Sequence, residues 1–177
     1  MAKVLFVNPI VREEDVPRHV PYGMALLAAI ALREGHLVQV YDANAWRSND
    51  TTHRQVLEAD DWDVVALGGI TTAYGSIKNL IGLVEELALP AVCVLGGGVL
   101  TSLPREMMAW LGRVDVGVIG EAFETFLNYM MKISGGILIL PHSQLASVES
   151  CLGTEQSTWR IFVLVTTAEA QSQLAAN

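Results

Sequence analysis

Five short apolar runs recur along the first 120 residues, and they constrain the fold more than any other feature of the chain. Each run is rich in Val, Ile and Leu without polar alternation, the pattern of parallel strands covered by helices on both faces. The runs are Lys3–Val7, Leu37–Tyr41, Asp63–Leu67, Ala91–Leu95 and Asp115–Ile119. Helical patterns separate them, so the sequence predicts a repeated βα unit that builds a five-stranded parallel sheet.

Helices are predicted between these strands. The first covers Tyr22–Glu34, where Pro21 and Gly35 mark its two ends, and a face of Ala25, Ala28, Ala29 and Leu32 is expected to pack on the sheet. The others are expected over His53–Ala59, Ser76–Leu87, Leu103–Leu111 and Glu121–Lys132. Right-handed crossovers allow the flavodoxin-like strand order 2-1-3-4-5 or that of its dinucleotide-binding relative. We predict a doubly wound, flavodoxin-like (Rossmann-type) α/β domain with order 2-1-3-4-5 over residues 1–133.

The βα pattern stops at Ser134. Residues 134–177 hold two apolar runs, Ile137–Leu140 and Ile161–Val165, separated by a polar stretch and followed by an Ala/Gln/Ser ending. Three interpretations stay open: the extension adds a strand and a helix, it is disordered, or it stands where a natural continuation was replaced or cut off. We assign it no structure.

Composition excludes several classes of partner. The formal net charge is -8 and the 11 Lys and Arg residues form no dense run, which argues against nucleic acid. Every apolar stretch is shorter than the ~20 residues that span a bilayer, and Met1 leads directly into a strand, so we expect a cytoplasmic protein without a membrane segment. Two cysteines, Cys93 and Cys151, provide neither a disulfide framework nor a four-thiolate metal site.

The predicted carboxyl ends of the strands are unusually rich in Gly, Asn and Thr. They read Asn8-Pro9, Asp42-Ala43-Asn44, Gly68-Gly69-Ile70-Thr71-Thr72, Gly96-Gly97-Gly98 and Gly120-Glu121. Ligands of open α/β sheets bind at this edge, and glycines let backbone approach a large ligand closely. Neither nucleotide-binding glycine motif occurs in the required context. Asn8 and Gly68 replace the acidic residues that a phosphorylated receiver domain needs.

An ordered set of motifs runs through Met1–Lys132. The pieces are Lys3–Pro9, Val20–Ala29, Leu32–His36, Val40–Asn44, Asp63–Leu67, Ile70–Tyr74, Val94–Gly98, Leu103-Pro104, Ile119–Glu121 and Glu124–Phe126. Together they resemble the cobalamin-binding domain at the N-terminus of B12-dependent radical SAM proteins, a group that includes methyltransferases and ring-forming enzymes. The resemblance implies that the corrin lies over the carboxyl ends of the strands and that the nucleotide tail enters between the third- and fourth-strand loops.

The resemblance also implies which residues meet the cofactor. The loop that begins at Asn8 and Pro9 and ends at Tyr22 and Gly23 would cover the corrin. The tail would meet Gly69, Thr71, Thr72 and Tyr74 from one loop and Gly96, Gly97 and Gly98 from the next, with Gly120 and Glu121 beside its base.

The histidines are not expected to bind the cobalt. The motif that supplies a lower axial His reads D-x-H-x-x-G, whereas around His19 the Asp position holds Pro17 and the Gly position holds Tyr22. The carboxylate that would hydrogen-bond to a ligating imidazole and orient it is therefore missing. His36, His53 and His142 lie on separate segments and are predicted at the surface. We therefore expect base-off/His-off cobalamin and no protein metal ligand.

The chain departs from the family in its second half. The family's barrel carries C-x-x-x-C-x-x-C for an iron–sulfur cluster, and two isolated cysteines cannot form it. We expect a chain that is not catalytic by itself, that binds cobalamin without a cluster, and that serves a radical SAM domain or partner protein of the methyltransferase type. The alternative is a non-enzymatic interaction or regulatory domain that keeps the fold but has lost the cofactor.

Overall fold

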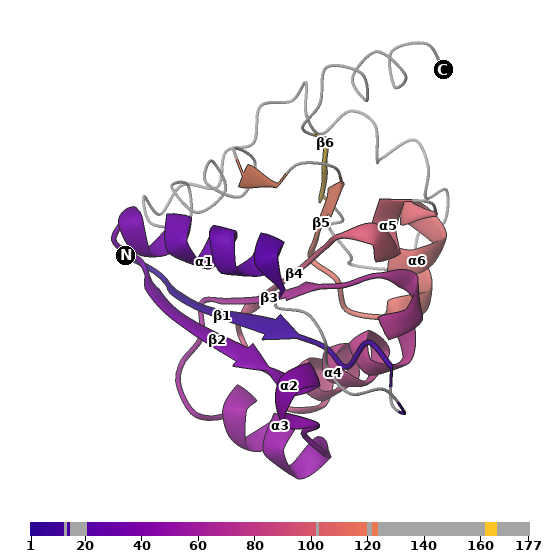
Figure 1. Ribbon diagram of the computed structural model, residues 1–177, viewed down its shortest axis with the longest axis horizontal. Helices are drawn as coiled ribbons and strands as arrows, with labels where there is room; N and C mark the ends of the chain where they lie inside the picture. The colour runs from indigo at the N-terminus through magenta and orange to yellow at the C-terminus, as the bar shows by residue number, and fades with distance from the viewer. Residues whose placement is uncertain (13, 15–20, 102, 120–121, 124–161, 166–177) are drawn as a thin grey trace.

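In the part of the chain that the structure describes, six strands form an all-parallel sheet with helices on both faces (Figure 1). The computed structural model describes residues 1–12, 14, 21–101, 103–119, 122–123 and 162–165. The strands are β1 (Lys3–Asn8), β2 (Leu37–Asp42), β3 (Val64–Gly68), β4 (Val92–Gly96), β5 (Val116–Ile119) and β6 (Phe162–Val165). Their order in the sheet is β2-β1-β3-β4-β5-β6, so the predicted order 2-1-3-4-5 is confirmed for the first five strands.

The sixth strand comes from the C-terminal extension. Within the second apolar run of that extension, β6 pairs in parallel with β5, from Val116 opposite Phe162 to Ile119 opposite Val165. The first of the three interpretations of residues 134–177 included an added strand, and β6 is such a strand. The sequence alone did not select it because four apolar residues define no pairing partner, and β5 lies more than forty positions earlier in the chain.

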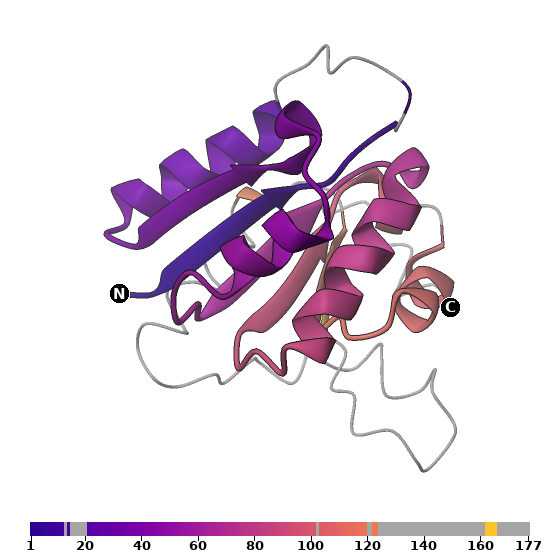
Figure 2. The ribbon, with the colours of Figure 1, turned by 90° about the horizontal axis from the view of Figure 1, so that it is seen from below.

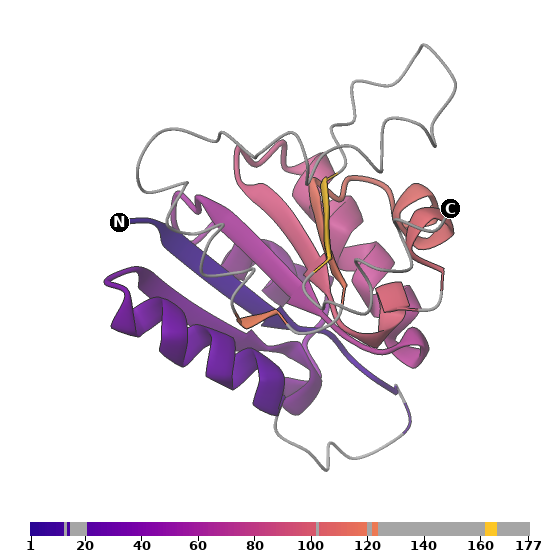
Figure 3. The same ribbon diagram turned by 90° about the horizontal axis from the view of Figure 1, so that it is seen from above.

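Helices and short turns connect the strands close to the predicted positions. They are α1 (Tyr22–Arg33), α2 (Ala43–Trp46), α3 (Asp50–Leu57), the 3-10 turn η1 (Thr71–Ala73), α4 (Tyr74–Glu86), α5 (Gly98–Thr101) and α6 (Pro104–Leu111). Figures 2 and 3 show α1 on one side of the sheet and α4 on the other. The helix predicted over Glu121–Lys132 lies outside the described residues.

Two buried clusters, one on each face of the sheet, form the core. Leu5 and Val7 point toward α4 and belong to the larger cluster, which also contains Leu57 of α3 and Leu111 of α6. Val4 and Phe6 point the other way, toward α1. Successive strand residues face opposite sides, so a strand buried on both sides needs an uninterrupted apolar run. This explains the pattern from which the sheet was predicted.

The face of α1 that packs on the sheet differs from the predicted one. Met24, Ala28 and Ala31 are buried. Of the predicted face only Ala28 agrees, because Ala25 and Ala29 are exposed and Leu32 is 57% exposed. Before Arg33 the helix carries no charged residue, so its sequence offers no polar side that would have identified the correct face.

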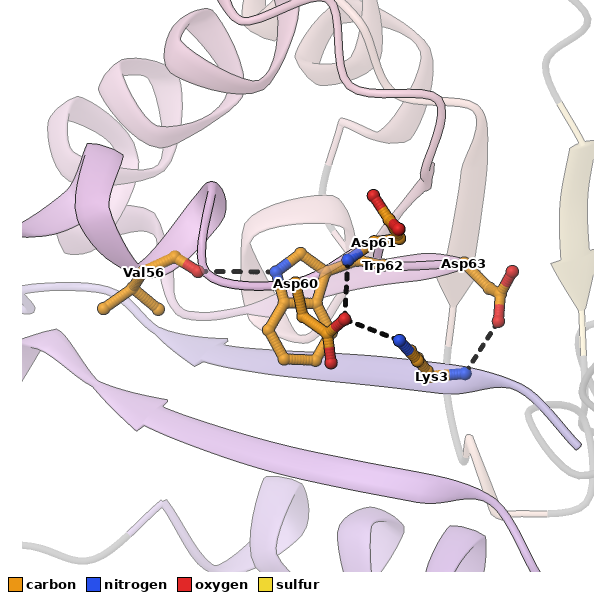
Figure 4. Close-up of polar contacts among 6 residues, drawn as sticks. All are labelled: Lys3, Val56, Asp60, Asp61, Trp62 and Asp63. Carbon is orange, nitrogen blue, oxygen red and sulfur yellow. Dashed lines mark hydrogen bonds and ion pairs between the residues drawn. The ribbon is translucent and has the colours of Figure 1, made fainter.

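Polar contacts join β1 to the turn before β3 at the amino edge of the sheet, opposite the predicted ligand edge. The Lys3 amide donates to Asp63 Oδ2 at 2.8 Å, and the Lys3 ammonium pairs with Asp60 at 2.5 Å (Figure 4). This hydrogen bond to Asp60 raises the pKa of Lys3. Trp62 beside it donates from Nε1 to the Val56 carbonyl at 3.3 Å. These contacts join the amino end of β1 to the turn before β3. Other residues lie at the carboxyl edge.

Three of the four tryptophans lie in the described part of the chain, and they do not share one environment. Trp62 is buried, whereas Trp46 is 79% exposed and Trp110 is 54% exposed. Trp159 lies outside the described residues. Within the part of the chain that the structure describes, no helix combines the length and the hydropathy needed to cross a membrane.

Candidate functional site

The carboxyl ends of the central strands meet at one edge of the sheet, where Gly68 of β3 lies opposite Gly96 of β4. Asn8 ends the neighbouring β1 and is buried. Its Nδ2 donates to Asp42 Oδ1 at 2.8 Å, and the same carboxylate oxygen accepts from the Ala45 amide at 2.9 Å. The Asn8 side chain therefore joins β1 to the end of β2.

The loops that follow β3 and β4 contact each other through their backbones. The Gly69 amide donates to the Gly96 carbonyl at 3.3 Å, and the Val99 amide donates to the Gly69 carbonyl at 3.0 Å. Gly97 has a φ of +89°, and a Cβ on it would lie 2.7 Å from the Gly69 oxygen. An ordinary side chain is excluded there by the protein's own backbone. The direction that a side chain on Gly97 would take is thus filled by Gly69.

A second glycine surface lies beside this contact, on the face that carries α1. A Cβ on Gly68 would meet only the Gly96 oxygen and Met24 Cε among the described residues, both at 3.9 Å. Of the atoms in the described ranges, a Cβ on Gly96 would meet those of Val118 alone, at 3.7 and 3.8 Å. Both glycines are partly exposed. We call this partly exposed backbone surface of Gly68 and Gly96, on the face that carries α1, the Gly68–Gly96 patch.

The structure brings some of the predicted site residues together and separates others. Thr71, Thr72, Gly97 and Gly98 are exposed at the carboxyl edge, and Pro9 is buried against Gly69. Tyr74 is half-buried against the core on the α4 side, with its hydroxyl 3.5 Å from Lys78 Nζ. Tyr22 is 76% exposed and Gly23 is exposed at the start of α1. Gly120, Glu121 and His19 lie outside the described residues.

Two residues at this edge escaped the sequence-based prediction of the site. Ser76 Oγ of α4 accepts a hydrogen bond from the Ile10 amide at 3.0 Å, and Asn44 Oδ1 of α2 accepts one from the Val11 amide at 3.1 Å. Asn44 had a signal, because it follows the end of a predicted strand. Ser76 had none, since a serine near the start of a helix is unremarkable in sequence.

The prediction that His36 and His53 lie at the surface is wrong, because both are buried. His36 Nδ1 accepts from the Ala2 amide at 3.2 Å, and His53 Nδ1 lies 2.7 Å from the Tyr41 hydroxyl. Burial lowers the pKa of both imidazoles. Each hydrogen bond holds a ring nitrogen inside the fold, where charge is unfavourable. His19 and His142 lie outside the described residues.

No group of three or more His, Cys, Asp or Glu side chains in the described ranges is arranged to hold a metal ion. Cys93, the described cysteine, is buried, and burial raises the pKa of its thiol to about 12. A thiol with that pKa is protonated at neutral pH and is a poor metal ligand.

A doubly wound parallel sheet with glycine backbone exposed at its carboxyl edge defines a flavodoxin-like ligand-binding domain. The comparison with protein families gives the particular class: the B12 binding domain matches residues 10–129. The chain belongs to this family. Comparison with curated protein sequences gives no match.

Solved structures of larger enzymes share the fold. The radical S-adenosylmethionine methyltransferase TsrM from Kitasatospora setae, with tryptophan substrate and a SAM analog bound, aligns with a TM-score of 0.67 at 21% identity, over 81% of this chain and 27% of that one. The same enzyme with cobalamin and a [4Fe-4S] cluster gives 0.66 at 20% identity, over 81% and 26%. The cobalamin-dependent radical enzyme OxsB with aqua-cobalamin gives 0.62 at 16% identity, over 79% and 20%. The chain therefore spans about a quarter or less of their lengths.

Proposed function

We propose that the chain is a cobalamin-binding module that holds the cofactor His-off and serves a radical SAM system of the methyltransferase type. Its membership of the B12 binding domain family carries the proposal. The similar structures of TsrM with bound cobalamin and of OxsB with bound aqua-cobalamin provide the context of a larger enzyme. Bound cobalamin would supply a cobalt centre able to carry a methyl group, and the chain would supply its position and environment.

The Gly68–Gly96 patch is where we propose that the nucleotide tail approaches the protein. The two glycines expose backbone on the α1 side, whereas Gly69 and Gly97 are occupied with each other. The exposed edge around the patch, formed by Thr71, Thr72 and Gly98, offers hydroxyls and backbone amides to the polar groups of the tail. Gly120 and Glu121 follow β5 in sequence and complete the proposed set.

The His-off state is supported by where the described histidines lie. Both His36 and His53 use Nδ1 inside the fold, and their burial disfavours the rearrangement that would expose a ring to the cobalt. His19 lacks the D-x-H-x-x-G spacing. Nitrogen splitting in the electron paramagnetic resonance spectrum of the cob(II)alamin form tests this state. Axial splitting that disappears in His19→Ala would overturn it.

Retention of hydroxocobalamin by the full chain through gel filtration tests the binding itself. We expect corrin absorbance to elute with the protein. In Gly68→Leu the backbone geometry accepts a side chain and the Cβ fits beside Met24, so the fold is retained while the leucine covers the patch. Affinity should fall by at least an order of magnitude. Gly82→Leu on α4 is the matched control, because a Cβ there meets nothing within 4 Å.

The outcomes separate the two functions that the sequence left open. Wild-type protein that elutes free of corrin would favour an interaction domain without cofactor. Equal retention by the wild type and by folded Gly68→Leu would support cobalamin binding but show that the nucleotide tail does not lie on the patch.

A further inference from the structure

The chain that leaves β1 turns toward the α4 side of the sheet. Pro9 is buried, with Cγ 3.4 Å from the position of a Cβ on Gly69, where Ile77 and Ala73 are also in contact. Ile10 packs against the core cluster on the same side. The helix α1, to which this connection leads, packs on the opposite face. The connection from β1 to α1 therefore begins on the α4 side of the sheet, opposite the face on which α1 packs.

Side chains from two other elements hold this turn. Ser76 of α4 accepts from the Ile10 amide at 3.0 Å, and Asn44 of α2 accepts from the Val11 amide at 3.1 Å. Arg47 then donates to the Arg12 carbonyl at 2.6 Å. Three consecutive residues are thus bound through their backbones. Asn44 is only 3% exposed, so its side chain has a fixed place in the fold.

The held segment stays clear of the Gly68–Gly96 patch. The described atoms within 4 Å of a Cβ on either glycine belong to Gly96, Met24 and Val118, and none belongs to Ile10, Val11 or Arg12. The patch faces α1, whereas the two anchoring side chains lie with α2 and α4. Because Ile10–Arg12 is held on the α4 side of the carboxyl edge, the backbone of Gly68 and Gly96 stays partly exposed on the α1 side.

We infer that Ser76 and Asn44 are positioning residues that hold Ile10–Arg12 away from the Gly68–Gly96 patch and keep it open to the cofactor tail. This inference rests on the proposed function and names two side chains that act on the site without touching the ligand. Loss of either acceptor releases a backbone amide, and the segment then samples positions over the carboxyl edge. Only the open fraction of molecules binds, so the apparent affinity falls in proportion to that fraction.

The test uses Ser76→Ala and Asn44→Ala in the full chain, with stopped-flow measurement of hydroxocobalamin association. One hydrogen bond corresponds to about 0.5–1.5 kcal/mol, which lowers the ratio of open to covered molecules roughly 2- to 12-fold, so each variant should bind more slowly at equal cobalamin concentration, by at most about 12-fold. Ser76→Thr and Asn44→Asp keep an oxygen acceptor and should restore the rate. Asn79→Ala is the control, because Asn79 also lies on α4 but donates to Asp50, at 2.6 Å, and not to the segment.

Trypsin cleavage after Arg12 gives a second reading that needs no cofactor. Cleavage should accelerate in Ser76→Ala and Asn44→Ala but not in Asn79→Ala, even if the three substitutions lower the free energy of unfolding by the same amount. Unchanged association rates and unchanged cleavage in the alanine variants would overturn the inference, as would a loss that neither conservative variant restores. Failure of the wild type to bind hydroxocobalamin would instead overturn the proposed function. The role of Ser76 and Asn44 in keeping a cobalamin site open would then be overturned as well.

Discussion

Gly97→Ala should destabilise the protein even in the absence of any cofactor. The new Cβ would lie 2.7 Å from the Gly69 oxygen and 3.1 Å from the Gly69 nitrogen, at a φ of +89°. The left-handed backbone costs an alanine about 1–2 kcal/mol. Displacing the neighbouring backbone adds about 1–3 kcal/mol, as overpacking of a filled site does. The free energy of unfolding should therefore fall by about 2–5 kcal/mol.

Thermal unfolding of the apoprotein, followed by circular dichroism, measures this effect. For a chain of this size about 1 kcal/mol lowers Tm by ~2–4 °C, so Gly97→Ala should melt roughly 4–20 °C below the wild type. Gly82→Ala inside α4 is the matched control, since its Cβ has open space and alanine stabilises a helix by about 0.5–1 kcal/mol relative to glycine. An apo Gly97→Ala protein as stable as the wild type would refute the reasoning, because it would show that the backbone of Gly69 accommodates a side chain at Gly97.

Three further outcomes are expected. Cys93 in a Cys151→Ser background should resist thiol reagents at pH 8 until the protein unfolds, since it is buried with a pKa near 12; rapid labelling of folded protein would contradict this. Because burial lowers the pKa of His53, the unfolded chain binds protons more readily, so stability is full above pH ~6.5 and falls below it. In urea titrations from pH 7.5 to 5, His53→Gln should flatten this fall, and an unchanged slope would reject the assignment. Tyr41→Phe removes the buried partner of His53 and should cost about 1–3 kcal/mol, whereas Tyr22→Phe at an exposed site should cost almost nothing.

Much of the architecture was predictable because its determinants are local in sequence. An apolar run flanked by helical patterns specifies a buried parallel strand, and the handedness of the crossovers limits the order of the strands. The glycines after the third and fourth apolar runs predicted where β3 and β4 end. The family was recognised from the order of these motifs, and the match over residues 10–129 confirms it.

The individual roles of the site residues were harder to predict. Gly97 was expected to lack a side chain so that a ligand could approach, but the structure shows that Gly69 occupies that space. Ser76 was not recognised, because its partner is an amide 66 residues away. His36 and His53 were placed at the surface, since nothing beside them in sequence reveals that Ala2 and Tyr41 would bury them.

The sequence by itself determined the strands, their parallel arrangement and the edge at which glycine collects, because periodicity and turn residues act over a few neighbouring positions. Only the tertiary structure decided which face of the uniformly apolar α1 packs inward, that β6 joins β5, and that Gly97 contacts Gly69 while Gly68 and Gly96 stay partly open. These outcomes depend on contacts between segments tens of residues apart. Excluded volume and the pairing of buried polar groups select such contacts only when the whole sheet has formed.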